Sequence, residues 1–283
     1  MADRGGRVDV QAWRGLLGAL GRPPGGVLLV QASLHRLGPV AGEEDDPQGR
    51  AGVVARALRE ALGEDGTLVA YTATPENSQT SRLYREATAG LSAAKLEIYH
   101  ERMPAFDPVR TPSSPTVGRL SEAIRLLPGA RRSAHPQTSF AAVGPLAEEI
   151  TGEHPLAQHL GWDSPLGRLY GCGAQALLIG TGARSFTPFH LLDYRLDAPV
   201  QTYRAKRLDR AGRPYWHAFQ GVSLDDLHFP ELGRRVLALG RAAEPPLRIP
   251  RAPIGGTSVA LVPIRAVVDL AAKVAVRATG VAG

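Results

Sequence analysis

His190 and Asp193 are the side chains in this sequence whose types and spacing best suit acid–base chemistry. They stand three residues apart, directly after a glycine-rich turn. On a helix, residues at this spacing share one face, so the carboxylate can hold one ring nitrogen of the imidazole. The other nitrogen can then accept a proton, which is the arrangement of a general base. Because this spacing is also common by chance, the pattern alone leaves a purely structural pair open.

The other histidines and the single cysteine offer weaker chemistry. His135 precedes an apolar run that begins at Phe140, and either a turn residue bonded to backbone or a functional histidine fits there. Cys172 lies between two glycines without a basic neighbour in sequence, which is weak support for a nucleophile. No CxxC or HExxH spacing occurs, so no metal site is expected. The remaining histidines stand in polar or loop-like segments and are predicted to be solvated: His35, His100, His154, His159, His217 and His228.

Composition and charge limit the class of protein. The 283 residues are 43% hydrophobic, which suits a single packed domain over residues 1–283, and the lone cysteine fits a reducing cytoplasm. No apolar run approaches the roughly 18 residues of a membrane span, so no membrane partner is expected. The net charge is +6, but the arginines are spread along the chain, which argues against a nucleic-acid surface. A positive field attracts anions and repels polycations.

Alternating strands and helices must position the candidate residues. Short apolar runs predict buried strands at residues 27–30, 67–71 and 176–179. Helical periodicity marks four further segments, residues 10–20, 50–62, 121–127 and 264–277. The order strand, helix, strand over residues 27–71 predicts a parallel βαβ unit, and residues 201–216 predict a hairpin. Residues 72–115 are rich in proline, serine and threonine, and there we expect an irregular active-site segment.

The carboxyl ends of the predicted strands form the expected binding edge, because ligands bind there in open α/β sheets. Residues 31–34, 72–75 and 180–190 follow the three strands and supply small or hydroxyl side chains and backbone N–H groups. Such groups suit a phosphate, an amide or a thioester oxygen. Turns after strands are often small and polar for packing reasons alone, so each turn by itself is a weak signal.

Several segments, in their order and spacing, resemble the aminoglycoside 3-N-acetyltransferase family over about residues 13–270. The matching segments are residues 26–34, 62–69, 103–112, 132–141, 154–156, 164–170 and 177–180. The resemblance implies an α/β fold, a three-layer α/β/α sandwich around a central mixed sheet. It also implies acetyl-CoA as co-substrate and direct transfer of its acetyl group to a small-molecule amine acceptor.

The resemblance further implies roles for individual residues. By the family pattern His-Leu-Ala-Glu, His190 and Asp193 are the catalytic pair: His190 takes the proton from the attacking amine, and Asp193 orients the ring. The pantetheine and phosphates of acetyl-CoA are expected along three turns, at Ser33, Leu34, Thr72, Thr111, Ser113 and Ser114. The acceptor is expected at Gln31, Phe186, Gln220 and Asp225.

Four positions near the expected reaction centre depart from the family pattern, namely Gln31, Phe186, Pro188 and Asp193. Asp193 shortens the usual glutamate by one methylene. Phe186 and Phe189 would make the acceptor side more apolar. Acidic family residues have near-neutral counterparts around Gln220, where Asp225 and Asp226 are candidate substitutes.

These departures leave three functions open. The first is acetylation of an amine of an aminoglycoside or related antibiotic, which would confer resistance. The second is acylation of a less charged amine in secondary-metabolite biosynthesis. The third is a divergent family member that has lost CoA-dependent activity. The oligomeric state is also open, with a homodimer as one alternative.

Overall fold

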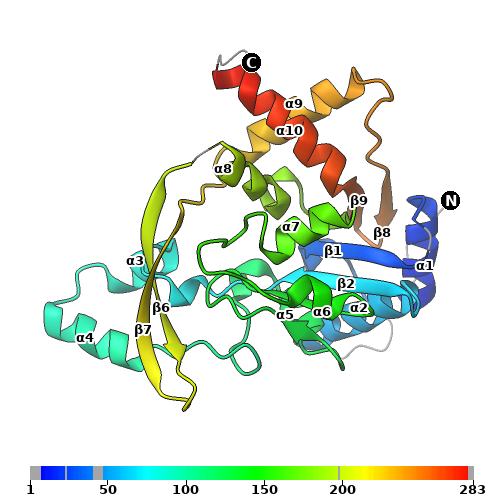
Figure 1. Cartoon of the computed structure of the whole chain (residues 1–283). Coiled ribbons are helices and arrows are strands. Elements are labelled where there is room, and N and C mark those ends of the chain that lie inside the picture. The colour runs from blue at the N-terminus through cyan, green and yellow to red at the C-terminus, as the bar shows by residue number, and fades with distance from the viewer. Residues whose placement is uncertain (1–7, 23, 41–46, 197, 280–283) are drawn as a thin grey trace.

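A mixed sheet of seven strands forms the centre of the described part of the molecule (Figure 1). The computed structural model describes residues 8–22, 24–40, 47–196 and 198–279. The strands lie in the order β3 (Arg131–Arg132), β4 (Phe140–Val143), β2 (Gly66–Tyr71), β1 (Gly26–Ala32), β5 (Gln175–Ile179), β9 (Thr257–Pro263) and β8 (Arg251–Ile254). β1 is parallel to both β2 and β5, whereas the outer strands pair antiparallel. The predicted parallel βαβ unit is therefore confirmed.

Helices cover both faces of this sheet, which confirms the predicted three-layer sandwich. One face packs against α1 (Val10–Ala19), α2 (Pro47–Ala61) and α5 (Arg119–Arg125). The other packs against α6 (Ala147–Thr151), α7 (Pro165–Gly171), α8 (Leu191–Arg195), α9 (Phe229–Arg241) and α10 (Ile264–Thr279). A hydrophobic core lies on each face of the sheet, and successive side chains of β1 point to opposite faces. Leu28 and Val30 therefore pack in one core, and Val27 and Leu29 pack in the other. This double burial explains why the strand is a continuous apolar run.

Residues 72–115 are not irregular throughout, which corrects the expectation for this segment. They contain two helices, α3 (Arg82–Thr88) and α4 (Ala93–Arg102). Neither helix has a buried residue, so neither shows the apolar stripe by which helices are recognised in sequence. The caps were the available signal: the hydroxyls of Ser81 and Ser92 accept hydrogen bonds from the backbone N–H groups of Tyr84 and Lys95.

A long hairpin, β6 (Val200–Leu208) and β7 (Pro214–Val222), crosses the α3–α4 segment (Figure 1). It is longer than the predicted residues 201–216. Lys206 anchors it: its Nζ donates to the carbonyls of His100 and Glu101 at 3.0 and 2.7 Å. Its backbone also exchanges two 2.9 Å hydrogen bonds with the Asn77 side chain. The hairpin therefore holds the α3–α4 segment against the rest of the molecule.

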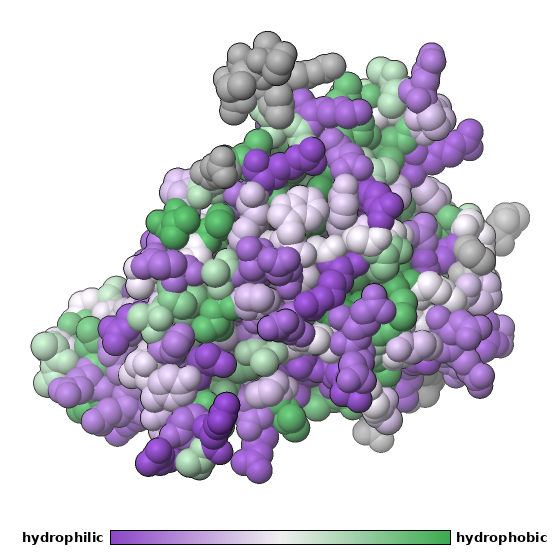
Figure 2. All heavy atoms as spheres, in the orientation of Figure 1, coloured by the Kyte–Doolittle hydropathy of each residue, from purple (hydrophilic) through white to green (hydrophobic). Residues whose placement is uncertain are grey.

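The face shown in Figure 2 mixes hydrophilic and apolar residues, and the apolar ones gather in small groups. Broad apolar patches are typical of docking surfaces, so this view gives no reason to propose one here. Across the described ranges, no helix has both the length and the apolar composition needed to cross a bilayer.

Three buried histidines lie together between β4 and the hairpin. His135, His154 and His159 are 0%, 8% and 1% exposed, so the prediction that His154 and His159 are solvated is wrong. The ring centroid of His135 lies 4.7 Å from that of His154 and 4.5 Å from that of His159. His135 bonds backbone at a turn, as one reading of the sequence allowed: its Nδ1 accepts from the N–H groups of Gln137 and Thr138.

We expect this histidine cluster to make the fold unstable in acid. Burial lowers the pKa of His154 to about 4 and of His159 to about 3, and it also holds the pKa of His135 well below its usual range. The unfolded chain, with histidine pKa near about 6.5, therefore binds more protons than the folded chain below that pH. Stability is complete above pH ~6.5 and should fall by up to about 1.4 kcal/mol per pH unit for each histidine as the pH drops.

Urea unfolding between pH 8 and pH 5 measures this dependence. His159→Leu is the matched control, because neither ring nitrogen of His159 has a hydrogen-bond partner among the described residues. In that variant the number of protons taken up on unfolding at low pH should fall by about one. Its free energy of unfolding at pH 8 should change little. An unfolding free energy that stays constant down to pH 5 would contradict the prediction.

Candidate active site

A cavity of about 800 Å³ opens at the carboxyl ends of β1, β2 and β5, where the sequence predicts binding. Its walls come from several segments: residues 30–35 at the end of β1, Arg50 of α2, Tyr71 at the end of β2, residues around the start of α5, residues between 181 and 190 after β5, and Asp226 and Phe229 around the start of α9. A glycine permits the close approach of two of these turns. Gly180 has φ +61, and a Cβ there would lie 2.7 Å from the Ser33 carbonyl oxygen.

His190 and Asp193 form a hydrogen-bonded pair at one end of this cavity. His190 ends the 3₁₀ helix η5 (Thr187–His190), and Asp193 lies in the first turn of α8. The His190 Nδ1 and Asp193 Oδ2 atoms are 2.8 Å apart, and both side chains are 12% exposed. The His190 ring also packs on Phe229, with 4.7 Å between ring centroids. With Nδ1 donating to the carboxylate, Nε2 of this cavity-lining ring is free to accept a proton.

Gln31 connects the end of β1 to the turn that positions His190. Its Nε2 donates to the Thr187 hydroxyl at 2.6 Å, and both residues line the cavity. The Gln31 Oε1 atom is buried and has no hydrogen-bond partner among the described residues. Because a buried unpaired acceptor is costly, this oxygen is suited to receive an N–H group from a bound molecule.

The predicted cofactor residues are divided between two places. Ser33 and Leu34 line the main cavity. Thr111, Ser113 and Ser114 line a neighbouring cavity of about 250 Å³, which shares Pro115 with the first.

Thr72 lines neither of the two cavities. It is fully buried, and its hydroxyl donates to the Ser139 carbonyl at 3.1 Å and accepts from Arg132 Nε at 3.2 Å. Its role in the structure is therefore to join β2 to the β3–β4 edge of the sheet.

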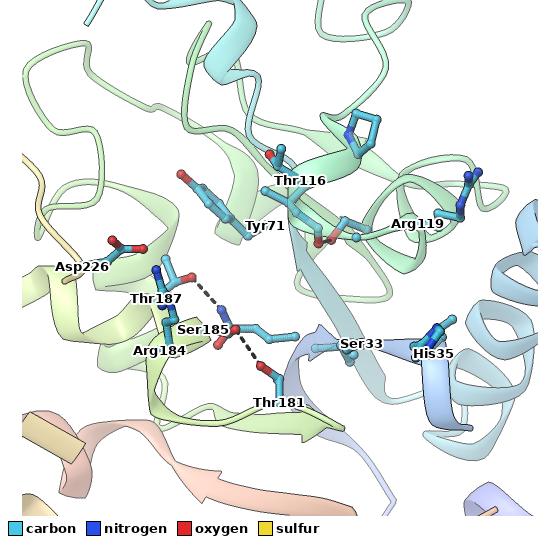
Figure 3. A pocket seen from close by; sticks show the side chains of 18 of the residues that line it. Ser33, His35, Tyr71, Thr116, Arg119, Thr181, Arg184, Ser185, Thr187 and Asp226 are labelled. Carbon is cyan, nitrogen blue, oxygen red and sulfur yellow. Dashed lines mark hydrogen bonds between the residues drawn. The ribbon is translucent and has the colours of Figure 1, made fainter. Parts of the chain in front are cut away.

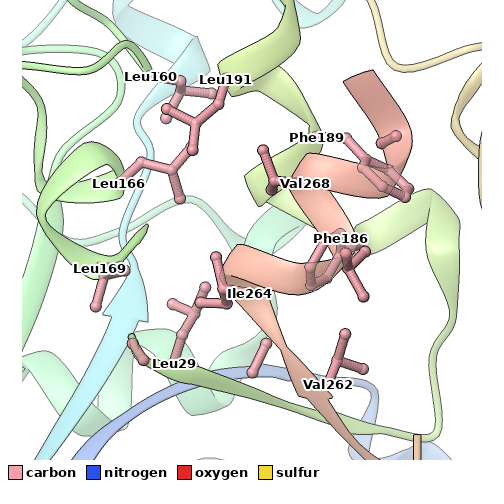
Figure 4. Close-up of a cluster of buried hydrophobic side chains, with 14 of the residues drawn as sticks. Leu29, Leu160, Leu166, Leu169, Phe186, Phe189, Leu191, Val262, Ile264 and Val268 are labelled. Atoms are coloured by element: carbon pink, nitrogen blue, oxygen red, sulfur yellow. The ribbon is translucent and has the colours of Figure 1, made fainter. Parts of the chain in front are cut away.

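Phe186 and Phe189 lie in the hydrophobic core and not on the acceptor wall (Figure 4). Each is 2% exposed, and their rings meet edge to face with centroids 4.9 Å apart. They fill the space between the sheet and α10, close to Val262, Ile264 and Val268 (Figure 4). The expectation that they make the acceptor side apolar is thus corrected.

Gln220 and Asp225 also lie outside the cavity lining. Gln220 is exposed on β7 and donates to the Thr202 hydroxyl at 2.9 Å. Asp225 is exposed and accepts from the Leu227 N–H at 3.0 Å, which closes a turn before α9. The neighbouring Asp226, the other candidate carboxylate in this loop, lines the cavity.

The sequence did not single out several residues that line the cavity, namely Tyr71, Arg119, Arg184 and Phe229, and it classed His35 as simply solvated. Tyr71 and Arg184 had a usable signal, since Tyr71 ends a predicted strand at the binding edge and Arg184 lies within the predicted binding turn, residues 180–190. Burial raises the pKa of Tyr71, so its hydroxyl stays protonated. The others come from loops and helix starts that only the folded chain brings together. In the described ranges, His, Cys, Asp and Glu side chains form no group of three that could hold a metal ion.

Comparison with known proteins points to one family. The family model described as aminoglycoside 3-N-acetyltransferase matches residues 29–275. Aminoglycoside N(3)-acetyltransferase III of Salmonella sp is 37% identical over 201 residues, which covers 70% of this chain and 65% of that relative, less than two thirds of its length.

Two solved structures have the same fold. The YokD protein from Bacillus subtilis superposes with a TM-score of 0.82 at 28% identity, covering 98% of this chain and 97% of that one. The AAC-IIIb structure, a binary complex with CoASH, gives a TM-score of 0.79 and covers 98% of this chain and 100% of that one. Because the two sequences are only 24% identical, this comparison supports similarity of the fold and nothing further.

Proposed function

The chain belongs to the aminoglycoside 3-N-acetyltransferase family, and from this premise we propose that it transfers an acetyl group from acetyl-CoA to an amine of a small molecule. The observation that supports this most directly is the His190–Asp193 pair at the edge of the 800 Å³ cavity. The names of its relatives indicate an aminoglycoside or related antibiotic as the acceptor.

The cavity has the chemistry that a CoA thioester needs. Arg50 and Arg119 line it and suit phosphate groups. The buried Gln31 Oε1, which has no hydrogen-bond partner among the described residues, suits an amide N–H of the pantetheine arm. When bound, acetyl-CoA supplies an activated acetyl carbon.

His190 acts as the general base of the proposed reaction. The neutral acceptor amine forms a C–N bond to the acetyl carbon, the C–S bond breaks, and the sulfur leaves as the CoA thiolate. The proton of the attacking nitrogen passes to His190 Nε2. The Asp193 carboxylate holds Nδ1 at 2.8 Å and stabilises the imidazolium that forms. Release of that proton to the leaving sulfur or to solvent restores the base.

A thiol-release assay with acetyl-CoA, combined with calorimetric titration of CoA, tests the proposal. We expect CoA binding and acceptor-dependent release of free thiol. Absence of CoA binding at millimolar concentration would reject acetyl transfer and favour a family member without CoA-dependent activity.

A less charged amine is the second candidate acceptor, and the cationic lining of the cavity favours it. Two arginines of its lining, Arg119 and Arg184, form no ion pair with a described residue, and one carboxylate, Asp226, lines the cavity beside them. A polycationic acceptor is repelled by such a field.

The proposed function also includes a cytoplasmic location, with a homodimer as one alternative for the oligomeric state. Sedimentation analysis would test whether the protein forms a homodimer.

A further inference from the structure

Three charged side chains that line the cavity, Arg119, Arg184 and Asp226, lie toward its two ends. Asp226, Arg184 and Thr187 stand toward one end in Figure 3, and Arg119 and His35 toward the other. Thr187 begins the same 3₁₀ helix that ends at His190, so the proposed base belongs to the Arg184–Asp226 end. This end is therefore where an acceptor must lie.

Packing fixes the backbone that bears Arg184 and Asp226. Arg184 is the middle residue of the 3₁₀ helix η4 (Ala183–Ser185), which packs against α9. The contact is close: a Cβ added at Gly233 of α9 would lie 2.4 Å from the Ala183 Cβ. Asp226 stands three residues before α9, and its carbonyl accepts from the Phe229 N–H at 3.1 Å. Both backbones are thus held by the start of the same helix.

Both charged groups are available to a ligand. Arg184 and Asp226 are exposed, line the cavity, and take part in none of the ion pairs formed between described residues. Among the cavity-lining residues labelled in Figure 3, the acceptor end therefore presents one cation, Arg184, and one anion, Asp226. A guanidinium binds carboxylate and phosphate groups through paired N–H donors, and it repels ammonium groups.

Resting on the proposed acetyl transfer and on its second candidate acceptor, the less charged amine, we infer that the acceptor is an amine that also bears an anionic group, a carboxylate or a phosphate, which Arg184 binds. Asp226 attracts the amine on entry, and His190 takes its proton during transfer. A molecule with several ammonium groups and no anion would meet Arg184 without a compensating charge. Arg184 is thus a specificity-determining residue, and the preferred acceptor is close to electrically neutral.

Matched acceptors test this inference in the thiol-release assay. Glucosamine has one amine and no anion, whereas glucosamine 6-phosphate and muramic acid add a phosphate and a carboxylate, and kanamycin has several amines. We expect kcat/KM to be at least about tenfold higher for the two anionic amines than for glucosamine, and lowest for kanamycin. In Arg184→Gln, the ratio of kcat/KM for glucosamine 6-phosphate to kcat/KM for glucosamine should fall close to one. In Arg184→Glu, kcat/KM for kanamycin should rise.

Arg119→Gln is the matched control, because it removes an arginine from the opposite end of the same cavity. It should raise KM for acetyl-CoA and leave the ratio between acceptors unchanged. The inference is overturned if wild-type enzyme prefers kanamycin, or if Arg184→Gln raises only the KM for acetyl-CoA and leaves the acceptor ratio intact. Either result leaves acetyl transfer standing. Absence of both CoA binding and thiol release with every acceptor would instead reject the proposed function, and the inference with it.

Discussion

Replacing His190 with alanine should lower kcat by about 10²- to 10⁴-fold, the usual contribution of a positioned general base. The variant removes the only histidine ring that combines cavity exposure with a carboxylate partner among the described residues. CoA affinity should change little, because the arginines and Gln31 remain in place. Steady-state thiol release measures the first quantity and calorimetric titration of CoA the second.

Two further variants separate loss of the base from loss of structure. His190→Gln keeps much of the side-chain volume against Phe229 and should be as inactive as His190→Ala. His217→Ala removes a histidine of the β7 strand that lies outside the cavity lining, and it should keep near wild-type turnover. A folded His190→Ala protein with wild-type turnover would rule out the assignment of His190 as the base.

Phe186→Ala should destabilise the fold by about 3–5 kcal/mol, the usual cost of removing a buried phenyl ring from a packed core. The ring is 2% exposed and contacts the core between the sheet and α10 (Figure 4). Urea unfolding with a linear extrapolation measures the change in the free energy of unfolding. A change of this size would be a large fraction of the total stability of an ordinary domain.

The same variant discriminates between the core position of Phe186 and its expected place on the acceptor wall. A wall residue would alter KM for the acceptor and leave the unfolding midpoint unchanged, which is the result that would contradict the structure. Tyr215→Ala is the control, because this aromatic residue is 39% exposed and its loss should cost no more than about 0.5–1 kcal/mol.

Patterns local in sequence predicted the central elements and the catalytic pair. The apolar runs of β1, β2 and β5 were visible because each strand is buried on both faces. The His190–Asp193 pair was visible because the two residues are three apart, and a single helical turn suffices to bring them together. The exposed helices α3 and α4 were missed because no core imposes a periodicity on them.

The acceptor end could not be predicted in the same way. Phe186 and Arg184 are two residues apart on a 3₁₀ turn, yet one side chain enters the core and the other lines the cavity. Periodicity does not distinguish these directions in an irregular turn, and family likeness at position 186 suggested the wrong side. Both Asp225 and Asp226 were candidates and the acceptor was expected at Asp225, whereas in the structure Asp225 closes a turn before α9 and Asp226 lines the cavity.

The sequence by itself determined the family, the three-layer fold and the proposed base with its carboxylate, because these depend on ordered motifs and on contacts within one helical turn. The tertiary structure alone decided which charges meet at the acceptor. Arg184 and Asp226 are 42 positions apart in the chain, and the packing of η4 against α9 brings them to one cavity. Long-range packing of this kind depends on the shape of the whole core, which no local pattern records.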